Sequence, residues 1–503
     1  MSSLDSALRP VRDVSPIAFG GLLVVLAAGT VMAARVSTTG FVLLAAITLV
    51  ALGLAALRWP RALLVVVVLA PIVDRFIIVR VMPDDVRAYT QFFSEGLLAA
   101  VGLALLADGL RRGRLVAAIR HPATIALGGF VAVAAVSALL NAVPPTVAAA
   151  GLLYTVDAVA LFYLCRIVGF DQRQAQLAIG ALVGAVALMA LIGFLQGLLD
   201  PNLLGLSVVT GRSGEAVRVG SIVRDPNVLG TLIGMTLPFA LFGTVHFSGP
   251  RARWLAGGVA LLLVIALLLT YSRGSWLGIV AGLGTVLVLL DRRVFLVALG
   301  MAVVALGVAT YMPRDLLVGS DPSGTPHTAP HFDAWDTTGE RIGAVGEGRD
   351  LRTLFVLNAM PILRDHPLVG VGPGRYGGAV AYDLRTPIYA EYRTDKLLTA
   401  QRTVDNFWLH ILVEGGVLGA TAFVATLVAL GYGLLRVALR SRGVRYVLAA
   451  GAIGGTAMVV VSTGTTMLLE GNTVAFMFWF VLGIGSLLRP IASASSASDA
   501  VAD

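Results

Sequence analysis

Charged side chains are the scarcest feature of this sequence. Asp, Glu, Lys and Arg together make up 13% of its 503 residues, against roughly 25% in soluble domains. The single cysteine, Cys165, lies in an apolar run, which excludes a disulfide framework and a cysteine-based metal site. The basic residues are almost all arginine and form no patch with interleaved aromatics, so we expect no nucleic-acid partner. With 57% of residues hydrophobic, the composition predicts a polytopic membrane protein.

Long apolar runs take the place of the missing charge. A helix needs about 20 apolar residues to cross a bilayer. Fourteen runs approach that length, at 15–34, 39–57, 62–81, 93–110, 122–142, 146–165, 174–198, 226–247, 253–270, 274–290, 294–311, 404–431, 445–465 and 472–488. The run 62–81 is the weakest, because Asp74, Arg75 and Arg80 interrupt it. The sequence therefore predicts an all-α, polytopic transmembrane helical bundle of about 12–14 helices.

Arginine is distributed unevenly between alternate short loops, which predicts the orientation of the chain. Positively charged short loops stay in the cytoplasm, so we expect both termini inside and the long polar segment 312–403 outside. The expected organisation is transmembrane helices in 1–311, an extracytoplasmic loop subdomain with short helices in 312–403, C-terminal transmembrane helices in 404–489 and a disordered tail in 490–503.

The long polar segment contains one helical pattern and one turn-rich motif. Apolar residues recur at helical spacing over 352–364, which predicts a short amphipathic helix that lies on the membrane or covers a cavity. Gly372, Gly374 and Gly377 then form a G-x-G-x-x-G pattern, but no strand precedes it and we reject a dinucleotide site. These glycines instead predict a tight turn that brings backbone close to a ligand or to the bilayer surface.

Several outer-loop arginines run against the inside-positive trend. Arg218 and Arg224 precede an apolar run in R-V-G-S-I-V-R-D-P-N, where Asp225 or Asn227 is a candidate helix cap. Arg273 sits between two apolar runs with almost no loop around it. In the structural interpretation, these arginines are solvated or pair with nearby residues. The functional interpretation is guanidinium groups that bind an anionic head group, since an arginine fork binds two phosphate oxygens at once.

Polar residues also mark the point where the long segment re-enters the apolar phase. Asp405 is a candidate general base or a cap of the helix that follows. Glu414 and His410 lie inside that apolar run, four residues apart. Carboxylates there have a partner or a function, because burying a charge in a membrane is costly. We expect His410 to be a hydrogen-bonded structural residue, and no spacing of His, Asp or Glu indicates a metal site.

Taken together, these motifs resemble the O-antigen ligase/polymerase family of bacterial membrane proteins over about residues 200–425. The resemblance rests on four blocks in order: R-x-G-x-x-x-R-D-P-N at Arg218–Asn227, Ser272-Arg273-Gly274, Arg352 followed by D-H-P-L-V-G-V-G-P-G at Asp365–Gly374, and D-N-F-W-L-x-x-L-x-E-x-G-x-x-G at Asp405–Gly419. Each block is weak alone, and the ordered set in a polytopic chain is more specific.

Members of this family are similar in architecture to the GT-C class of membrane glycosyltransferases. The resemblance implies transfer of a glycan from a polyprenyl diphosphate, such as undecaprenyl diphosphate, at the outer face of the bacterial cytoplasmic (inner) membrane. The acceptor is another sugar chain, lipid A core or a protein. The resemblance implies no cofactor and no metal. The implied partners are the lipid-linked donor, the glycan acceptor, the bilayer, and proteins of polysaccharide export or chain-length control.

The resemblance also assigns roles to residues. Arg218, Arg224 and Arg273 would clamp the diphosphate, Arg352 would close over it, and Asp405 would accept the proton of the acceptor hydroxyl. Further candidates for substrate contact are Asn227, Asn406, His366 and Glu414, although Glu414 has the alternative of orienting its helix.

One departure from the family pattern bears on the type of transfer. Ligases of this family carry His-Asn or His-Ser where this chain has Asp405-Asn406. The departure favours a polymerase of O-antigen or exopolysaccharide and leaves ligation to lipid or protein as the alternative. An anion transporter of the bicarbonate type is a rival, but it should need paired broken helices, which the sequence does not indicate. A scaffold role in an envelope complex would leave the arginines replaceable.

Overall fold

The computed structural model describes residues 25–26, 29–30, 32–34, 37–74, 92–199, 203, 218–311, 351–394 and 403–489. The helices with described bounds are α3 (Thr38–Arg58), α4 (Pro60–Val73), α7 (Phe93–Arg111), α8 (Leu115–Ile119), α9 (Pro122–Leu140), α10 (Pro145–Val156), α11 (Val159–Val168), α12 (Gln172–Leu198), the 3₁₀ helix η3 (Ser221–Val223), α13 (Pro226–His246), α14 (Pro250–Leu269), α15 (Arg273–Leu289), α16 (Arg292–Tyr311), α18 (Leu351–Asp365), α19 (Ala379–Asp383), α20 (Ile388–Glu391), α22 (Phe407–Leu439), α23 (Gly443–Ser462) and α24 (Asn472–Gly485).

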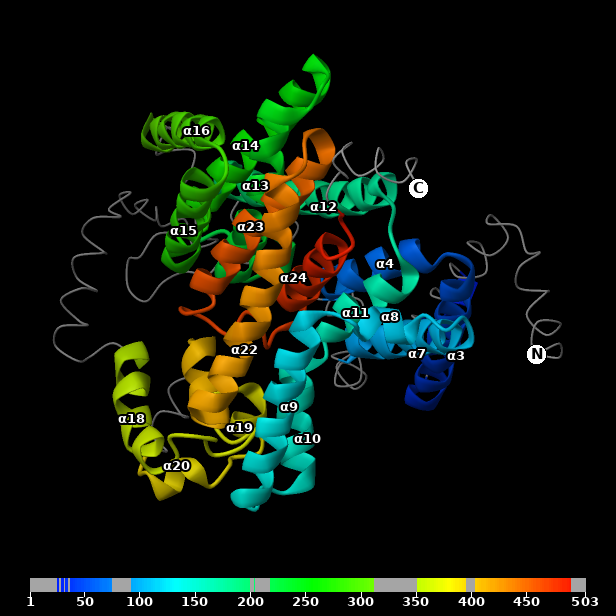
Figure 1. Ribbon diagram of the computed structural model, residues 1–503, viewed down its shortest axis with the longest axis vertical. Coiled ribbons are helices and arrows are strands. Elements are labelled where there is room, and N and C mark those ends of the chain that lie inside the picture. The colour runs from blue at the N-terminus through cyan, green and yellow to red at the C-terminus, as the bar shows by residue number, and fades with distance from the viewer. Residues whose placement is uncertain are drawn as a thin grey trace, which may run out of the picture.

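The expectation of a polytopic helical bundle is confirmed. Within the described ranges, eight helices are long and apolar enough to cross a membrane, and α10 with α11 makes a ninth if that bent pair is one span. Three shorter apolar helices, α4, α15 and α24, pack among them (Figure 1). Most of the first expected run, 15–34, and the segments 312–350, 395–402 and 490–503 fall outside the described residues.

Two of the expected spans are interrupted, which the sequence did not indicate. The run 146–165 forms two helices, α10 and α11, which meet at an angle of 56°. At that bend the carboxylate of Asp157 accepts a hydrogen bond from the Ala158 amide, which gives the backbone a partner outside the helical pattern. The last long run continues to Leu439 as α22, but its backbone leaves the helical conformation at Gly416.

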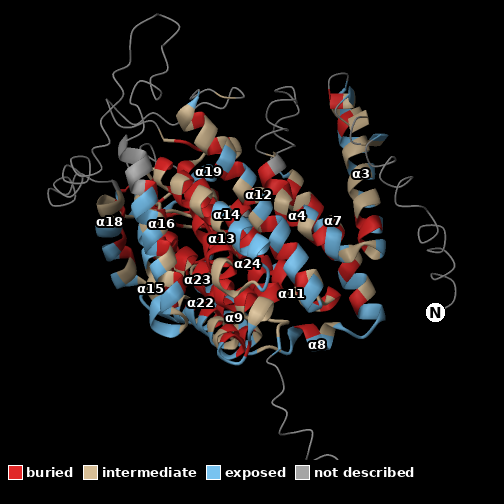
Figure 2. Ribbon diagram, turned by 90° about the horizontal axis from the view of Figure 1, so that it is seen from above, coloured by how far each residue is buried: buried red, intermediate tan, exposed pale blue. Residues whose placement is uncertain are grey.

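Helix α13 is the central element of the bundle. It is buried along almost its whole length (Figure 2). It packs on α23, where Gly451 and Gly455 leave no room for a side chain against Phe239 and Met235 of α13. Helix α15 lies on another side of α23, with Gly282 against the Gly454 carbonyl. Small residues at helix contacts let backbones approach closely in membranes. The close packing of α13 and α15 on α23 therefore fixes where α13 and α15 begin relative to the end of α23.

A second, smaller core lies beside the N-terminal part of α22 (Figure 1). The expected amphipathic helix is confirmed as α18, whose buried face contributes Phe355, Ala359 and Ile362. Tyr376 and Tyr389 stack within the core at 5.6 Å between ring centroids, and burial raises the pKa of both phenols. Helix α18 therefore packs against the start of α22. Whether α18 also lies on the membrane surface stays a prediction.

Candidate functional site

The break in α22 at Gly416 is capped by backbone from the segment that follows α18. Gly416 has φ 60° and ψ −168°, a region essentially restricted to glycine. Beyond it, the amides of Val417 and Leu418 donate to the carbonyl oxygens of Pro367 and Leu368, at 2.9 and 3.0 Å. The first amides of a helix have no partner within it, so the H-P-L motif supplies the acceptors that the second half of α22 requires.

The same segment also closes the end of the first half of α22. The amides of Val371 and Gly372 donate to the carbonyl oxygens of Val413 and Glu414, each at 3.0 Å. Ser137 and Asn141 of α9 both donate to the carbonyl oxygen of Gly370, at 3.1 and 3.0 Å. Backbone groups inside a membrane protein must be paired, and here one loop pairs both sides of a broken helix.

Glu414 fastens this loop through its side chain. Its carboxylate accepts hydrogen bonds from the amides of Gly374 and Tyr376, at 3.0 and 2.8 Å. His410, one turn earlier, donates from Nδ1 to the Tyr376 carbonyl at 2.6 Å, and its Nε2 lies 3.7 Å from the carboxylate. Both side chains are buried, with 5% and 2% exposed. Glu414 is thus engaged with backbone amides, in line with its structural alternative, and His410 is hydrogen-bonded as expected.

The four glycines of the V-G-V-G-P-G-R-Y-G stretch serve this packing. Gly370, Gly372, Gly374 and Gly377 all have positive φ, between 70° and 98°. A Cβ at Gly370 would collide with the backbone of Glu414, and one at Gly374 with α10. A tight turn is therefore confirmed, and it brings its backbone close to α9, α10 and α22. An approach of this backbone to a ligand or to the bilayer surface stays a prediction.

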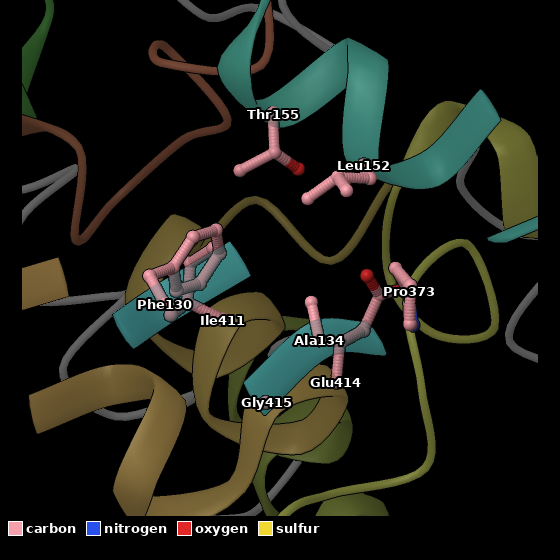
Figure 3. A pocket seen from close by; sticks show the side chains of 8 residues that line it. All are labelled: Phe130, Ala134, Leu152, Thr155, Pro373, Ile411, Glu414 and Gly415. Carbon is pink, nitrogen blue, oxygen red and sulfur yellow. The ribbon is translucent and has the colours of Figure 1, made fainter. Parts of the chain in front are cut away.

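A small pocket remains beside Glu414, between α9, α10 and α22 (Figure 3). Figure 3 shows Glu414 and Pro373 on one side of it and Thr155 with Leu152 on the other. Its volume is about 10 Å³, room for about one water molecule. This pocket is therefore too small for a sugar or a diphosphate.

Arg218 and Arg273 belong to a second group, at the starts of α13 and α15. The Arg218 Nε donates to the Thr270 carbonyl at 3.0 Å, and its Nη2 donates to Asn227 Oδ1 at 2.8 Å. The Ser272 hydroxyl donates to the same Asn227 oxygen at 3.0 Å. The side-chain amide of Asn227 therefore links the R-D-P-N block to Ser272, which lies 45 residues later in the sequence. Ser272 immediately precedes Arg273.

The R-D-P-N turn shapes the start of α13. Asp225 is the cap, because its carboxylate accepts from the amides of Asn227 and Val228 at 2.8 and 3.2 Å. Arg224, just before it, takes the left-handed conformation with φ 57° and is exposed. The cap at Asp225 was one of the two structural interpretations, and the exposed guanidinium of Arg224 stands at the amide end of a buried helix.

The connection after α23 brings three helix starts together. Thr463 accepts a hydrogen bond on its carbonyl from the Phe407 amide of α22, at 3.0 Å. Ser462 shares a hydrogen bond with Thr231, in the second turn of α13, at 3.1 Å. Thr465 lies against Gly274 of α15 so closely that no Cβ fits there. Helix N-termini attract anions through their dipole and free amides, and here three of them border one short segment.

The mouth of α22 carries an open ion pair. Arg352 Nη2 lies 3.5 Å from Asp405 Oδ2, with 43% and 25% of the side chains exposed. Thr403 donates to the other carboxylate oxygen at 3.3 Å. Asn406, not Asp405, caps the helix by accepting from the Leu409 amide at 3.0 Å. The interpretation of Asp405 as the cap was therefore wrong, and its carboxylate faces Arg352 instead.

The candidate residues lie in three groups. Arg218 and Asn227 are hydrogen-bonded to each other near Arg273, at the starts of α13 and α15, and the Arg352–Asp405 pair lies at the start of α22. Glu414 lies at the helix break, and His366 immediately precedes the segment that caps it. About eleven helical residues separate Asp405 from that break, roughly 16 Å along a helix axis.

Sequence reasoning missed two participants. The connection Ser462–Thr466 was read only as the end of an apolar run, and its T-G-T-T composition was the available turn signal. Glu470, which is buried and accepts from the Ala379 amide at 3.1 Å, was not singled out either. A lone carboxylate before the last apolar run was the signal for it. In the described part of the chain, no three His, Cys, Asp or Glu side chains gather closely enough to hold a metal ion.

A protein-family model matches part of the chain. Residues 258–424 match the family model Wzy_C, described as O-antigen ligase. The matched range begins in α14 and runs past the break in α22, so it includes Arg273, Arg352, Asp405 and Glu414. No curated protein matches the chain.

Proposed function

We propose that this multi-pass membrane protein, whose residues 258–424 match the O-antigen ligase family model, transfers glycan from a polyprenyl-diphosphate-linked donor. The transfer takes place at the outer face of the cytoplasmic membrane, with both termini inside. The favoured product is a surface polysaccharide, which makes the chain an O-antigen or exopolysaccharide polymerase of GT-C-like architecture.

The observation that carries this proposal is the convergence of helix starts on the connection 462–466. Arg273 is the first residue of α15 and Arg224 immediately precedes the cap of α13. The Arg352–Asp405 pair stands at the start of α22. Positive helix ends and arginines combined are suited to a diphosphate, whose oxygens accept several charge-assisted hydrogen bonds.

The chemistry needs one base and one stabilised leaving group. An acceptor hydroxyl oxygen attacks the anomeric carbon of the donor sugar, and the bond from that carbon to the diphosphate oxygen breaks with inversion. The proton of the hydroxyl passes to the Asp405 carboxylate, and the lipid diphosphate leaves. The arginines neutralise the charge that develops on it, which is the kind of electrostatic stabilisation that usually dominates catalysis. Arg352 holds Asp405 in place until the donor diphosphate competes for its guanidinium.

The residues at the mouth of α22 favour a polymerase over a ligase. Asp405 occupies the position where ligases of this family carry His, and Asn406 is engaged as the helix cap. An Asp that is 25% exposed beside an Arg is open to a large glycan acceptor from the aqueous side.

Anion transport is the second candidate, because the structure contains the broken spans that such a protein would need. Both the α10–α11 bend and the Gly416 break lie beside Glu414. However, backbone from 367–372 occupies the broken ends of α22, whereas a transporter would direct such ends at its substrate. The break therefore supports loop anchoring more than ion passage.

The test compares polymer formation in cells that depend on this gene. Arg273→Ala and Asp405→Asn should abolish polymer while the membrane level of the protein stays normal, because neither side chain is in a packed core. Asp108→Asn is the matched control, since Asp108 pairs with Arg112 at 2.8 Å with a similar exposure of 24%. Full polymer in both site variants would refute the assignment. Loss of activity with a metal chelator would contradict metal-independent transfer, and anion uptake by the purified protein in vesicles would favour the transporter.

A further inference from the structure

A larger pocket lies far from the proposed active site, where the C-terminal part of α22 meets the end of α24 and the start of α9. Its volume is about 280 Å³, at the lower end of the ~300–1,000 Å³ typical of ligand sites. The α22 residues that line it, from Leu430 to Val437, lie more than ten residues beyond the Gly416 break. That is roughly 20 Å or more along the helix, so this pocket is separate from the site around 462–466.

One end of the pocket is polar and positively charged. Arg436 lines it, is exposed and lies 5.8 Å from the ring of Tyr432 on its own helix. Among the residues that the structure describes, no carboxylate pairs with Arg436. His121 lines the same pocket, and its Nδ1 accepts from the Ala123 amide. That bond leaves the ring proton on Nε2, which is a hydrogen-bond donor.

A second arginine stands behind the wall at this end. Arg166 donates from Nη1 to the hydroxyl of Ser486, a lining residue, at 3.2 Å. Its Nε donates to the Ala118 carbonyl at 2.7 Å, so the guanidinium is held in place. The fixed charge of Arg166 adds to that of Arg436, and the described structure thus offers the pocket positive charge and donors.

The remaining walls are apolar. Leu430, Leu434 and Val437 of α22 line them, together with Leu482 and Leu488 from the end of α24 and the turn after it. The pocket thus combines a polar, positively charged end with an apolar wall.

We propose that this pocket binds an anionic phospholipid, with the phosphate at Arg436 and His121 and the acyl chains along α22. Basic pockets between transmembrane helices are suited to lipid head groups of this charge. This inference does not depend on the proposed transfer reaction.

Gly433 gives the proposal a steric test. A Cβ at this lining position meets no atom within 4 Å, so Gly433→Leu should fold and fill the pocket. Gly431 is the matched control: it is on the same helix, is equally open and does not line the pocket. Arg436→Gln removes the charge, with Arg440→Gln as its control outside the pocket.

The experiment measures lipid retention by the purified full-length protein. The protein in detergent is titrated with phosphatidylglycerol or phosphatidylcholine, and bound lipid is counted by native mass spectrometry. Wild type, Gly431→Leu and Arg440→Gln should retain phosphatidylglycerol preferentially. Arg436→Gln should weaken it about fivefold, from the loss of one arginine near a lipid phosphate, and Gly433→Leu should abolish it.

Two outcomes would overturn the proposal: equal retention of both lipids by wild type, or unchanged retention in Arg436→Gln and Gly433→Leu. If Gly433→Leu does not fold, the comparison of Arg436→Gln with Arg440→Gln decides alone. Polymer formation plays no part in this readout, so failure of the proposed reaction would leave the lipid result intact.

Discussion

The two places where α22 meets the rest of the chain are built differently. At the Gly416 break, four backbone hydrogen bonds of 2.9–3.0 Å join the helix to the segment 367–372, and buried Glu414 adds two more. At the mouth of the helix, Arg352 and Asp405 meet at 3.5 Å with much of both side chains exposed. The carboxylate at the first place is buried, whereas the carboxylate at the second is partly exposed to solvent.

This difference distinguishes Glu414, a carboxylate with a structural role, from Asp405, a candidate catalytic carboxylate. Glu414 has satisfied its oxygens with amides that cannot move away, so a substrate would gain little from it. Asp405 pairs with the exposed cation of Arg352 and accepts from the Thr403 hydroxyl. An exposed ion pair holds its partners with only about 0–1 kcal/mol. An incoming diphosphate can displace such a pair at small cost. The predictions that follow test this contrast, from the largest expected loss of stability to the smallest.

Gly416→Ala should cause the largest loss. The backbone conformation there costs a non-glycine residue about 1–3 kcal/mol, and a Cβ would also collide with the Leu368 backbone. We expect a drop of about 3 kcal/mol or more and a low membrane level. Gly431→Ala is the control on the same helix. Gly431 is helical with open space around it, so alanine should stabilise it by about 0.5–1 kcal/mol. Equal thermal midpoints for the two variants would contradict a break that only glycine at position 416 can form.

Glu414→Gln should have an intermediate effect. A carboxamide can accept from only one of the two amides, and its NH₂ group then faces the other. Loss of a hydrogen bond to a charged acceptor with a buried amide left unpaired costs about 2–3 kcal/mol. The loosened loop should also be cut earlier by trypsin after Arg375, which is 13% exposed in the native fold. Asp108→Asn, far from this loop and 24% exposed, should change neither the midpoint nor the cleavage. Unchanged cleavage in Glu414→Gln would oppose the anchoring role.

The sequence supported the helices better than their interruptions. Apolar runs over 93–110, 226–247 and 253–270 predicted α7, α13 and α14 to within a few residues, because a bilayer demands that length and composition. The break at Gly416 could not be recognised, since its signal is an ordinary glycine in a chain with 57 of them. What makes it a break is the pairing with 367–372, about fifty residues earlier, and a local pattern does not contain that contact.

The candidate site shows the same limit. The arginines and Asp405 were found because charges are rare here, and the Asp225 cap because R-D-P-N precedes an apolar run. The contacts of Ser462–Thr466 with the starts of α15 and α22 were not predictable from the sequence. Thr463 contributes only a carbonyl oxygen to them, and Thr465 only the volume of its side chain. The tie between Arg218 and Ser272 likewise passes through Asn227, a residue read first as a possible cap.

Arg352→Gln should have the smallest effect on stability and a large effect on activity. The chain contains a matched pair for it: Arg112 and Asp108 are 46% and 24% exposed, close to the values at the mouth. Breaking either pair should shift stability by at most about 0.5–1 kcal/mol. If Arg352 binds the donor diphosphate, its loss should lower polymer formation by about 100-fold or more, while Arg112→Gln leaves it unchanged.

Exchange of charges sharpens this last comparison. In the double variant Arg352→Asp with Asp405→Arg, the ion pair can form again with its polarity reversed, so a purely structural role predicts recovery of activity. The proposed chemistry predicts the opposite, because an aspartate at position 352 repels the diphosphate and an arginine at position 405 accepts no proton. The same exchange at Arg112 and Asp108 should be silent in both midpoint and polymer. Recovery of polymer in the mouth exchange would return Asp405 to the class of structural carboxylates that Glu414 represents.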